Sequence, residues 1–157
     1  MKRSAAVIIF VAALACFSVL EAAENKAGSE KGYVVDIEDA TKGNAYFRKV
    51  LFTAPNSQLT VMSLKPGEDI GMETHEKGDQ FIRIEEGEGR AILNGKEYRI
   101  EDDWAMVIPA GTMHNIVNTG DEPLRLYVIY SPPEHPDGTV HKTKEEAMKS
   151  EQERHGR

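Results

Sequence analysis

Hydrophobic and polar residues alternate with a period of two along most of the chain from residue 33 onward. The alternation falls in nine short runs, separated by Pro, Gly, Asn and Asp: residues 33–37, 45–52, 58–64, 80–85, 90–93, 97–100, 104–108, 114–117 and 124–130. A period of two is that of a half-buried strand, and closely spaced short strands are typical of a sandwich or barrel. No long helical pattern interrupts these runs. The pattern predicts one all-β domain over residues 33–132.

The segments between and after the runs support this organisation. Asn94-Gly95 separates two strand-like runs, and both residues tolerate the positive φ angles of a two-residue hairpin turn. Residues 24–32 are polar and aperiodic, which indicates a flexible linker. Residues 133–157 form a polar C-terminal tail, for which an irregular, solvated structure is the default and a short helix with a Glu145–Lys149 pair is the alternative.

The N-terminus differs from the rest of the chain. Lys2 and Arg3 precede an apolar run over residues 5–20, which is short for a transmembrane helix. This pattern predicts a signal peptide over residues 1–23 and a secreted or periplasmic protein. Cys16, the single cysteine, reads by default as a small apolar residue of the signal, and alternatively as a lipid anchor.

Length and charge narrow the function classes. A chain of 157 residues has room for about one domain. Its formal net charge is −7, and basic residues do not cluster beside aromatic ones. These features argue against nucleic acid as a partner and against anionic membrane surfaces.

Two separate stretches hold the polar residues best suited to chemistry. Glu73 and His75 are two apart, so on a strand their side chains share one face. By the same parity Gln80 shares a face with two isoleucines and points inward, whereas Asp79 points outward. His114 follows a Pro-x-Gly turn and begins another run. A carboxylate, two imidazoles and an amide that converge in a barrel are predicted to hold a divalent metal.

The spacing of these residues resembles the two motifs of the cupin superfamily. The stretches that carry the resemblance are Gly67-x5-Glu73-x-His75-x4-Gln80-x6-Gly87 and Pro109-x-Gly111-x2-His114-x3-Asn118. The resemblance covers about residues 45–130. It implies a double-stranded β-helix, or jelly-roll barrel, with a metal held by Glu73, His75, Gln80 and His114.

The match departs from the usual motifs at three positions. Cupins usually carry histidine at position 73, glutamate at position 80 and glycine at position 103, where this chain has Glu, Gln and Asp. The set still contains one carboxylate, moved from position 80 to position 73. Exchanging an imidazole for an amide favours harder ions, so Fe2+ or Mn2+ is expected, with Zn2+ or Ni2+ as further candidates. In the alternative interpretation no metal binds, and Glu73 and Gln80 only form hydrogen bonds with His75.

For several other residues we expect a structural role rather than a functional one. Glu85, Glu86 and Glu88 are interpreted as solvated loop charges. Methionines 62, 72, 106 and 113 are interpreted as core residues, with a Met-lined pocket as the alternative. We expect Trp104 to anchor the core or a dimer interface, Arg83 to face outward, one of Tyr127 and Tyr130 to reach the cavity, and His135 and His141 to lie at the surface.

Two classes of function remain open. The first is an enzyme that uses a mononuclear metal on a small polar substrate, by oxygenation or by isomerase or lyase chemistry. The second is a barrel that binds a metal, a carbohydrate or another small molecule without turning it over. The fold cannot decide between them, because cupin-like barrels serve both purposes. A homodimer is expected in either case.

Overall fold

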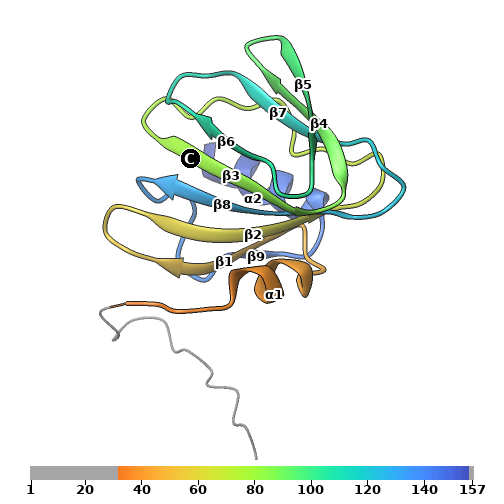
Figure 1. The fold of residues 1–157 in the computed structure, drawn as a ribbon. Helices are drawn as coiled ribbons and strands as arrows, with labels where there is room; N and C mark the ends of the chain where they lie inside the picture. The colour runs from red at the N-terminus through yellow and green to blue at the C-terminus, as the bar shows by residue number, and fades with distance from the viewer. Residues whose placement is uncertain (1–31, 156–157) are drawn as a thin grey trace, which may run out of the picture.

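The computed structural model describes residues 32–155, and two antiparallel sheets that face each other dominate it (Figure 1). The six-stranded sheet has the order β6-β3-β8-β2-β1-β9, and the three-stranded sheet has the order β5-β4-β7. The strands are β1 (Arg48–Thr53), β2 (Gln58–Leu64), β3 (Asp79–Glu86), β4 (Glu88–Leu93), β5 (Lys96–Glu101), β6 (Ala105–Ile108), β7 (His114–Asn118), β8 (Leu124–Ser131) and β9 (Val140–His141). The expected jelly-roll topology is confirmed. The expected signal peptide, Cys16 and residues 24–31 of the expected linker lie outside the described residues.

The core lies between the two sheets, and the parity of each strand decides what enters it. On β3 the inner positions are Gln80, Ile82 and Ile84, each at most 2% exposed. The register pairs Ile82 with Val128 of β8, and Val128 with Thr60 of β2, so inward residues form continuous rows across the sheet. Removing these apolar rows from water is the main stabilising contribution to the barrel.

The fold is mostly β rather than all-β, because the described residues contain two helices, and the first of them begins at the last residue of the first predicted strand. Residues 33–36 form no strand, and α1 spans Ile37–Lys42. The Asp36 side chain caps it by accepting a hydrogen bond from Asp39 N, and Lys42 donates to Glu38 one turn earlier. The helix packs against β2, β3 and β8 and covers part of one face of the six-stranded sheet.

Turn geometry explains several motif residues as structural. Asn94 (φ 48°) and Gly95 (φ 79°) form the expected hairpin turn between β4 and β5. Asp103, which stands where cupins usually have glycine, has a φ of 69°. This departure therefore affects a turn only, as expected. Gly87 has a φ of 92°, and a Cβ there would lie 2.8 Å from the Pro123 carbonyl oxygen. The buried Asn118 side chain donates to Leu64 O and to Glu122 O.

The C-terminal tail forms a helix, α2 (Lys144–His155), behind the six-stranded sheet in the view of Figure 1. The default expectation of a solvated, irregular tail is therefore wrong and the expected helix forms, but the Glu145–Lys149 pair is not among the ion pairs of the described residues. Only one apolar residue of α2 is buried: Ala147 is 2% exposed and belongs to the core, whereas Met148 is 50% exposed. No helix among residues 32–155 is long and apolar enough to cross a membrane.

Candidate metal centre

Two backbone hydrogen bonds bring the two motif stretches together. Glu73 N donates to His114 O and His114 N donates to Glu73 O, each at 2.9 Å, in an isolated β-bridge. His114 is the first residue of β7, and His75 lies in the loop between Glu73 and β3. Glu73 and His75 therefore lie in a bridge and a loop rather than on a regular strand, yet their side chains meet.

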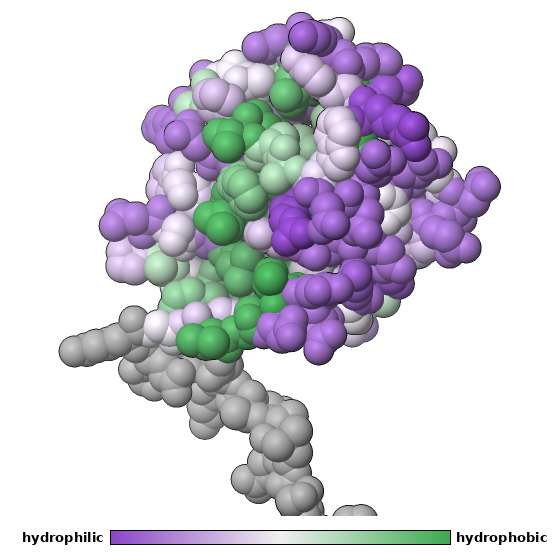
Figure 2. All heavy atoms as spheres, in the orientation of Figure 1, coloured by the Kyte–Doolittle hydropathy of each residue, from purple (hydrophilic) through white to green (hydrophobic). Residues whose placement is uncertain are grey.

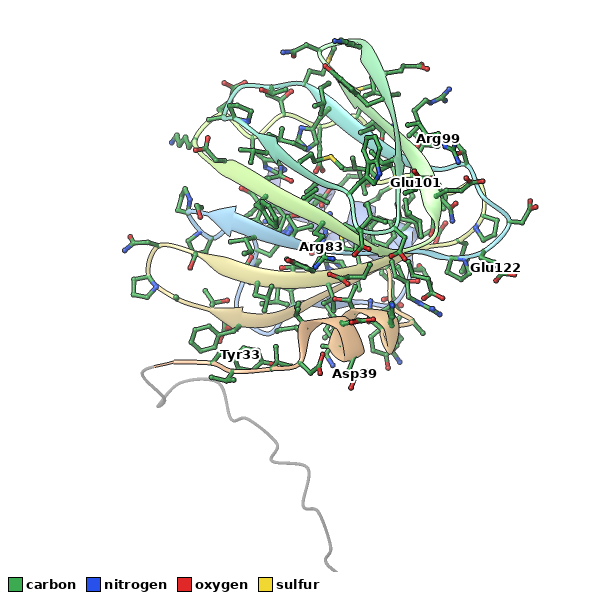
Figure 3. All side chains as sticks on the ribbon, viewed as in Figure 1. Tyr33, Asp39, Arg83, Arg99, Glu101 and Glu122 are labelled. Atoms are coloured by element: carbon green, nitrogen blue, oxygen red, sulfur yellow. The ribbon has the colours of Figure 1, made fainter. Side chains whose placement is uncertain are left out.

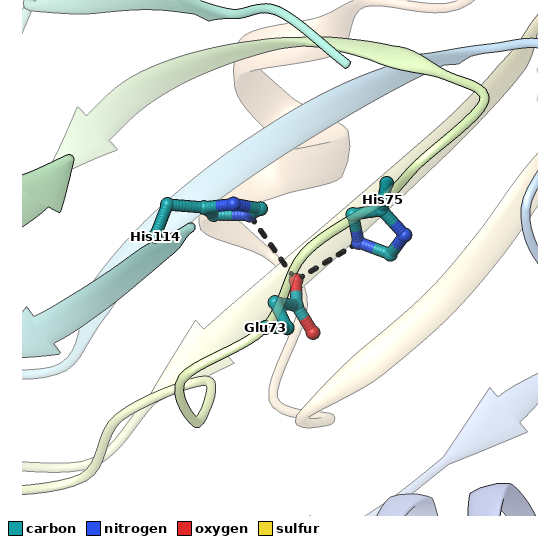
Figure 4. Close-up of side chains that lie close together, drawn as sticks. All are labelled: Glu73, His75 and His114. Carbon is teal, nitrogen blue, oxygen red and sulfur yellow. Dashed lines mark hydrogen bonds and ion pairs between the residues drawn. The ribbon is translucent and has the colours of Figure 1, made fainter. Parts of the chain in front are cut away.

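The imidazoles of His75 and His114 converge on the Glu73 carboxylate (Figure 4). Glu73 Oε1 lies 3.2 Å from His75 Nε2 and 3.4 Å from His114 Nε2. One ligand atom from each residue lies within 4.8 Å of the other two, a spacing at which the three can hold one metal ion. His114 is completely buried, whereas the side chains of His75 and Glu73 are 14% and 22% exposed. This arrangement matches the two-histidine, one-carboxylate triad expected from the sequence.

The second nitrogen of each imidazole has its own partner. His114 Nδ1 lies 2.9 Å from Thr112 O, to which it donates its proton, so that Nε2 keeps its lone pair. His75 Nδ1 lies 3.3 Å from Glu134 Oε2. Partners of this kind fix the ring orientation and the tautomer of metal-binding histidines. The donor set therefore fits a divalent metal: both Nε2 atoms point at the carboxylate while both Nδ1 atoms are held from behind.

Gln80 completes the group that the sequence brings together. Its side chain is 2% exposed and points inward, and its Nε2 lies 3.2 Å from His114 Nε2. Because His114 Nδ1 already donates to a carbonyl, Gln80 donates this bond. Asp79 points outward, as expected, and accepts from Ala110 N. Rotation of the Gln80 amide would bring its oxygen to the same place, so its role as a fourth ligand stays a prediction.

The charges of the centre are strongly coupled. Burial opposes ionisation of Glu73, but the hydrogen bond from His75 and the charge of His75 lower the pKa of this carboxyl to about 2. Burial likewise disfavours the His75 imidazolium, yet Glu134 and Glu73 raise the pKa of His75 to about 9. Without a metal, His75 is therefore a cation between two carboxylates at neutral pH. A metal ion would take the place of that proton.

The barrel interior holds further titratable groups that the sequence did not assign to the site. The Tyr130 ring packs edge-on against His75 (5.8 Å between centroids) and against His135 (5.0 Å). Burial raises the pKa of the Tyr130 hydroxyl and lowers the pKa of His135 to about 3. Parity had left Tyr127 and Tyr130 open, and Tyr130 is the inward residue.

The expectation that His135 and His141 lie at the surface is wrong. They are 7% and 9% exposed. The buried Gln58 amide donates to His135 O and accepts from His135 N, which fixes an irregular segment against the barrel. In the sequence, only the inward position of the Gln58 amide on β2 could have indicated this contact. Its partner, His135, lies in a segment without periodicity. Burial also lowers the pKa of His141.

The structure also tests the expectations for the other residues, and several of these expectations are wrong. Glu85 is 4% exposed rather than solvated, because α1 packs over β3, and burial raises its pKa. Met72 and Met113 are exposed rather than core residues, whereas Met62 is buried. Trp104 is 48% exposed and does not anchor the core. Arg83 lies on the outer face of β3, as expected (Figure 3).

Comparison with known proteins agrees with the fold. The family model described as "Cupin domain" matches residues 60–130. An uncharacterised protein of Bacillus subtilis, YrkC, is 51% identical over 128 residues, which cover 77% of this chain and 68% of that protein. An uncharacterised protein of Acanthamoeba polyphaga mimivirus is 46% identical and covers 69% of this chain and 70% of its own length. A crystal structure of a Bacillus halodurans protein superposes with a TM-score of 0.76 at 48% identity, covering 78% of this chain and 98% of that one. The chain belongs to the cupin superfamily.

Proposed function

We propose that this protein is a metal-dependent enzyme that acts on a small polar molecule inside the barrel. The observation that carries the proposal is the convergence of Glu73, His75 and His114 on one point, with both Nδ1 atoms held by other partners. Fe2+ or Mn2+ suits one carboxylate and two imidazoles, with Zn2+ or Ni2+ as further candidates. Three protein ligands leave coordination positions open for a substrate.

The residues around the centre support turnover rather than storage of a metal. A bound divalent ion would supply Lewis-acid chemistry, or redox chemistry if it is iron. Tyr130 keeps its hydroxyl proton because burial raises its pKa, and His135 stays neutral because burial lowers its pKa. The barrel therefore holds a hydroxyl that donates a hydrogen bond and a neutral imidazole close to His75. Both groups can orient a small polar substrate at the centre by hydrogen bonds, for oxygenation as well as for isomerase or lyase chemistry.

A second candidate function, a non-catalytic binding barrel, also has an observation in its favour. Glu134, His75, Glu73, His114 and Gln80 form one continuous chain of polar contacts. Apart from the Glu73–His114 contact, which joins two acceptor atoms, each of these contacts can be a hydrogen bond without a metal. In this case the barrel would bind a carbohydrate or another small molecule.

Metal analysis separates the two candidates. The protein is purified without a histidine tag, and its metal content is compared with that of a His114→Ala variant and a Glu76→Ala variant in the exposed loop before β3. We expect about one equivalent of iron or manganese in the parent and in Glu76→Ala, and none in His114→Ala. Loaded protein is then screened for oxygen uptake and for conversion of small acids, diols and sugars. A folded parent that takes up no divalent ion would overturn the enzyme and favour the binding barrel.

We also propose export to the periplasm or the medium, which the N-terminal pattern of charge and hydrophobicity supports. Fractionation of cells that express the full chain tests this proposal. We expect the protein outside the cytoplasm, shortened by about 23 residues, or retained on a membrane through Cys16 if that residue is lipidated. Full-length protein in the cytoplasmic fraction would contradict it.

A further inference from the structure

A completely buried arginine lies on the inner face of β1. Arg48 is 2% exposed. It pairs with His141 of β9 on one side, and on the other side its neighbours across the sheet are Met62, then Leu126, then Ile84. These three residues are apolar and buried. A guanidinium in such a layer costs free energy unless charged or polar partners compensate it. Its presence needs a reason beyond packing.

The partners of Arg48 compensate it only in part. Arg48 Nη1 donates to Glu151 Oε1 at 2.7 Å, and the guanidinium lies 5.6 Å from the centre of the Phe47 ring. Arg48 Nε has no acceptor among the described residues. Glu151 belongs to α2, and its side chain is 35% exposed. A buried cation is thus paired with a carboxylate that comes from a surface helix and that solvent reaches.

The same interior contains the candidate metal centre. Burial raises the pKa of Glu73, whereas His75 and, after it, the charge of Arg48 lower this pKa. After burial, the charge of Arg48 is also the next cause of the lowered pKa of His135. Both ring nitrogens of His135 are buried without a hydrogen-bond partner among the described residues. Arg48 Nε and both His135 ring nitrogens are therefore buried polar atoms without a hydrogen-bond partner among the described residues, and the charge of Arg48 acts on both Glu73 and His135.

We propose that Arg48 is an anion subsite of the barrel, which binds a carboxylate of the substrate while another polar group of the same molecule reaches the metal centre. The inference rests on the proposed function and adds the substrate class: small carboxylic acids. Arginine matches a carboxylate with two parallel hydrogen bonds, and it cannot lose its charge on burial. The Glu151 carboxylate occupies this place when no substrate is bound, and the unpartnered Nε becomes a donor for the incoming anion.

The proposal makes opposite predictions for the two partners of one ion pair. Glu151 competes with the ligand for Arg48, so Glu151→Gln is expected to tighten the binding of small diacids by roughly fivefold or more. Arg48→Gln is expected to weaken it by at least about tenfold. Glu153→Gln is the matched control, because it removes the same charge from an exposed position of the same helix. A purely structural ion pair would not produce a gain of affinity in Glu151→Gln.

The experiment titrates metal-loaded protein with malonate, succinate and glutarate, and with their neutral diamides, by calorimetry. The metal content of every variant is measured first. Absence of metal from the parent would overturn the proposed function, whereas full loading with the same diacid affinity in Glu151→Gln and Glu153→Gln would overturn the anion subsite alone. Equal binding of diacids and diamides would also overturn it. Tighter diacid binding in Glu151→Gln only, with a preferred chain length, is the expected result, and it does not depend on whether Arg48→Gln folds.

Discussion

At the scale of single residues, the candidate centre is a cluster of charged side chains that are buried or partly buried. His75 lies between the carboxylates of Glu73 and Glu134, at 3.2 Å and 3.3 Å. This arrangement stabilises the imidazolium in the folded, metal-free protein. In the unfolded chain the carboxylates no longer surround His75, and its pKa returns to its ordinary value. The stability of the metal-free protein therefore depends on pH through His75.

The direction of this dependence follows from the raised pKa. His75 has a pKa of about 9 in the fold against an ordinary value of 6.5. Its contribution is fully present below pH 6.5 and is lost as pH rises through 9. We expect the metal-free protein to lose about 1 to 3 kcal/mol between these values. Urea unfolding at several pH values, with and without His75→Gln, measures it. An equal slope in the parent and the variant would contradict the assignment.

Motif spacing was sufficient to predict that the four side chains meet, whereas the parity argument held for Gln80 but not for Glu73 and His75, which lie in a bridge and a loop. Alternation placed Gln80 inward and Asp79 outward, and motif spacing placed His75 with His114. The groups that sequence reasoning missed share one property: their positions depend on contacts between distant segments. His135, for example, is buried because Gln58 holds its backbone from another strand. No periodicity in residues 133–141 reports such a contact.

At the scale of elements, α2 is a helix held by charge. Lys144 forms an ion pair with Asp69, and Glu151 forms one with Arg48. Between them, Ala147 is the apolar contact with the core. Its sequence is too polar for a hydrophobic pattern to predict its docking. The prediction of a strand over residues 33–37 was wrong because it relied on the apolar residues of this segment alone. Asp36 instead caps the helix that follows.

The attachment of α2 can be broken without disturbing the barrel. Ala147→Asp places a carboxylate where the side chain is 2% exposed, which costs about 2 kcal/mol or more. We expect α2 to detach, so that proteases cleave residues 144–155 rapidly while the barrel keeps its β-sheet circular dichroism. Met148→Asp, at the neighbouring exposed position, serves as the control and is expected to behave like the parent. Equal protease resistance in both variants would show that the ion pairs alone hold the helix.

At the scale of the whole molecule, a band of apolar residues crosses the outer face of the six-stranded sheet (Figure 2). The register aligns Val107, Phe81, Ile129, Leu59 and Phe52 side by side on five successive strands. Val107 is 64% exposed, and Tyr33 extends the band by stacking on Phe52. We propose that this band is the interface of the expected homodimer, because a twofold axis would place it against its own copy.

Charge on the band tests this dimer. Val107→Asp is expected to raise the dissociation constant of the dimer by roughly 30-fold or more while the protomer stays folded. Val140→Asp, at an exposed valine on edge strand β9, is the control. Light scattering coupled to gel filtration measures both. A parent that is monomeric at high concentration, or a Val107→Asp variant that remains dimeric, would contradict the band as the interface.

The bridge between Glu73 and His114 also bears on the order of folding. Its two backbone hydrogen bonds join segments that are far apart along the chain, and the three candidate ligands meet only when this long loop has closed. Such closure is slow compared with the formation of the neighbouring hairpin at Asn94-Gly95. Metal capture is therefore expected to follow assembly of the barrel rather than to nucleate it. A bound metal would then stabilise only chains that have already reached the native topology, and incompletely closed barrels would gain no stability from it.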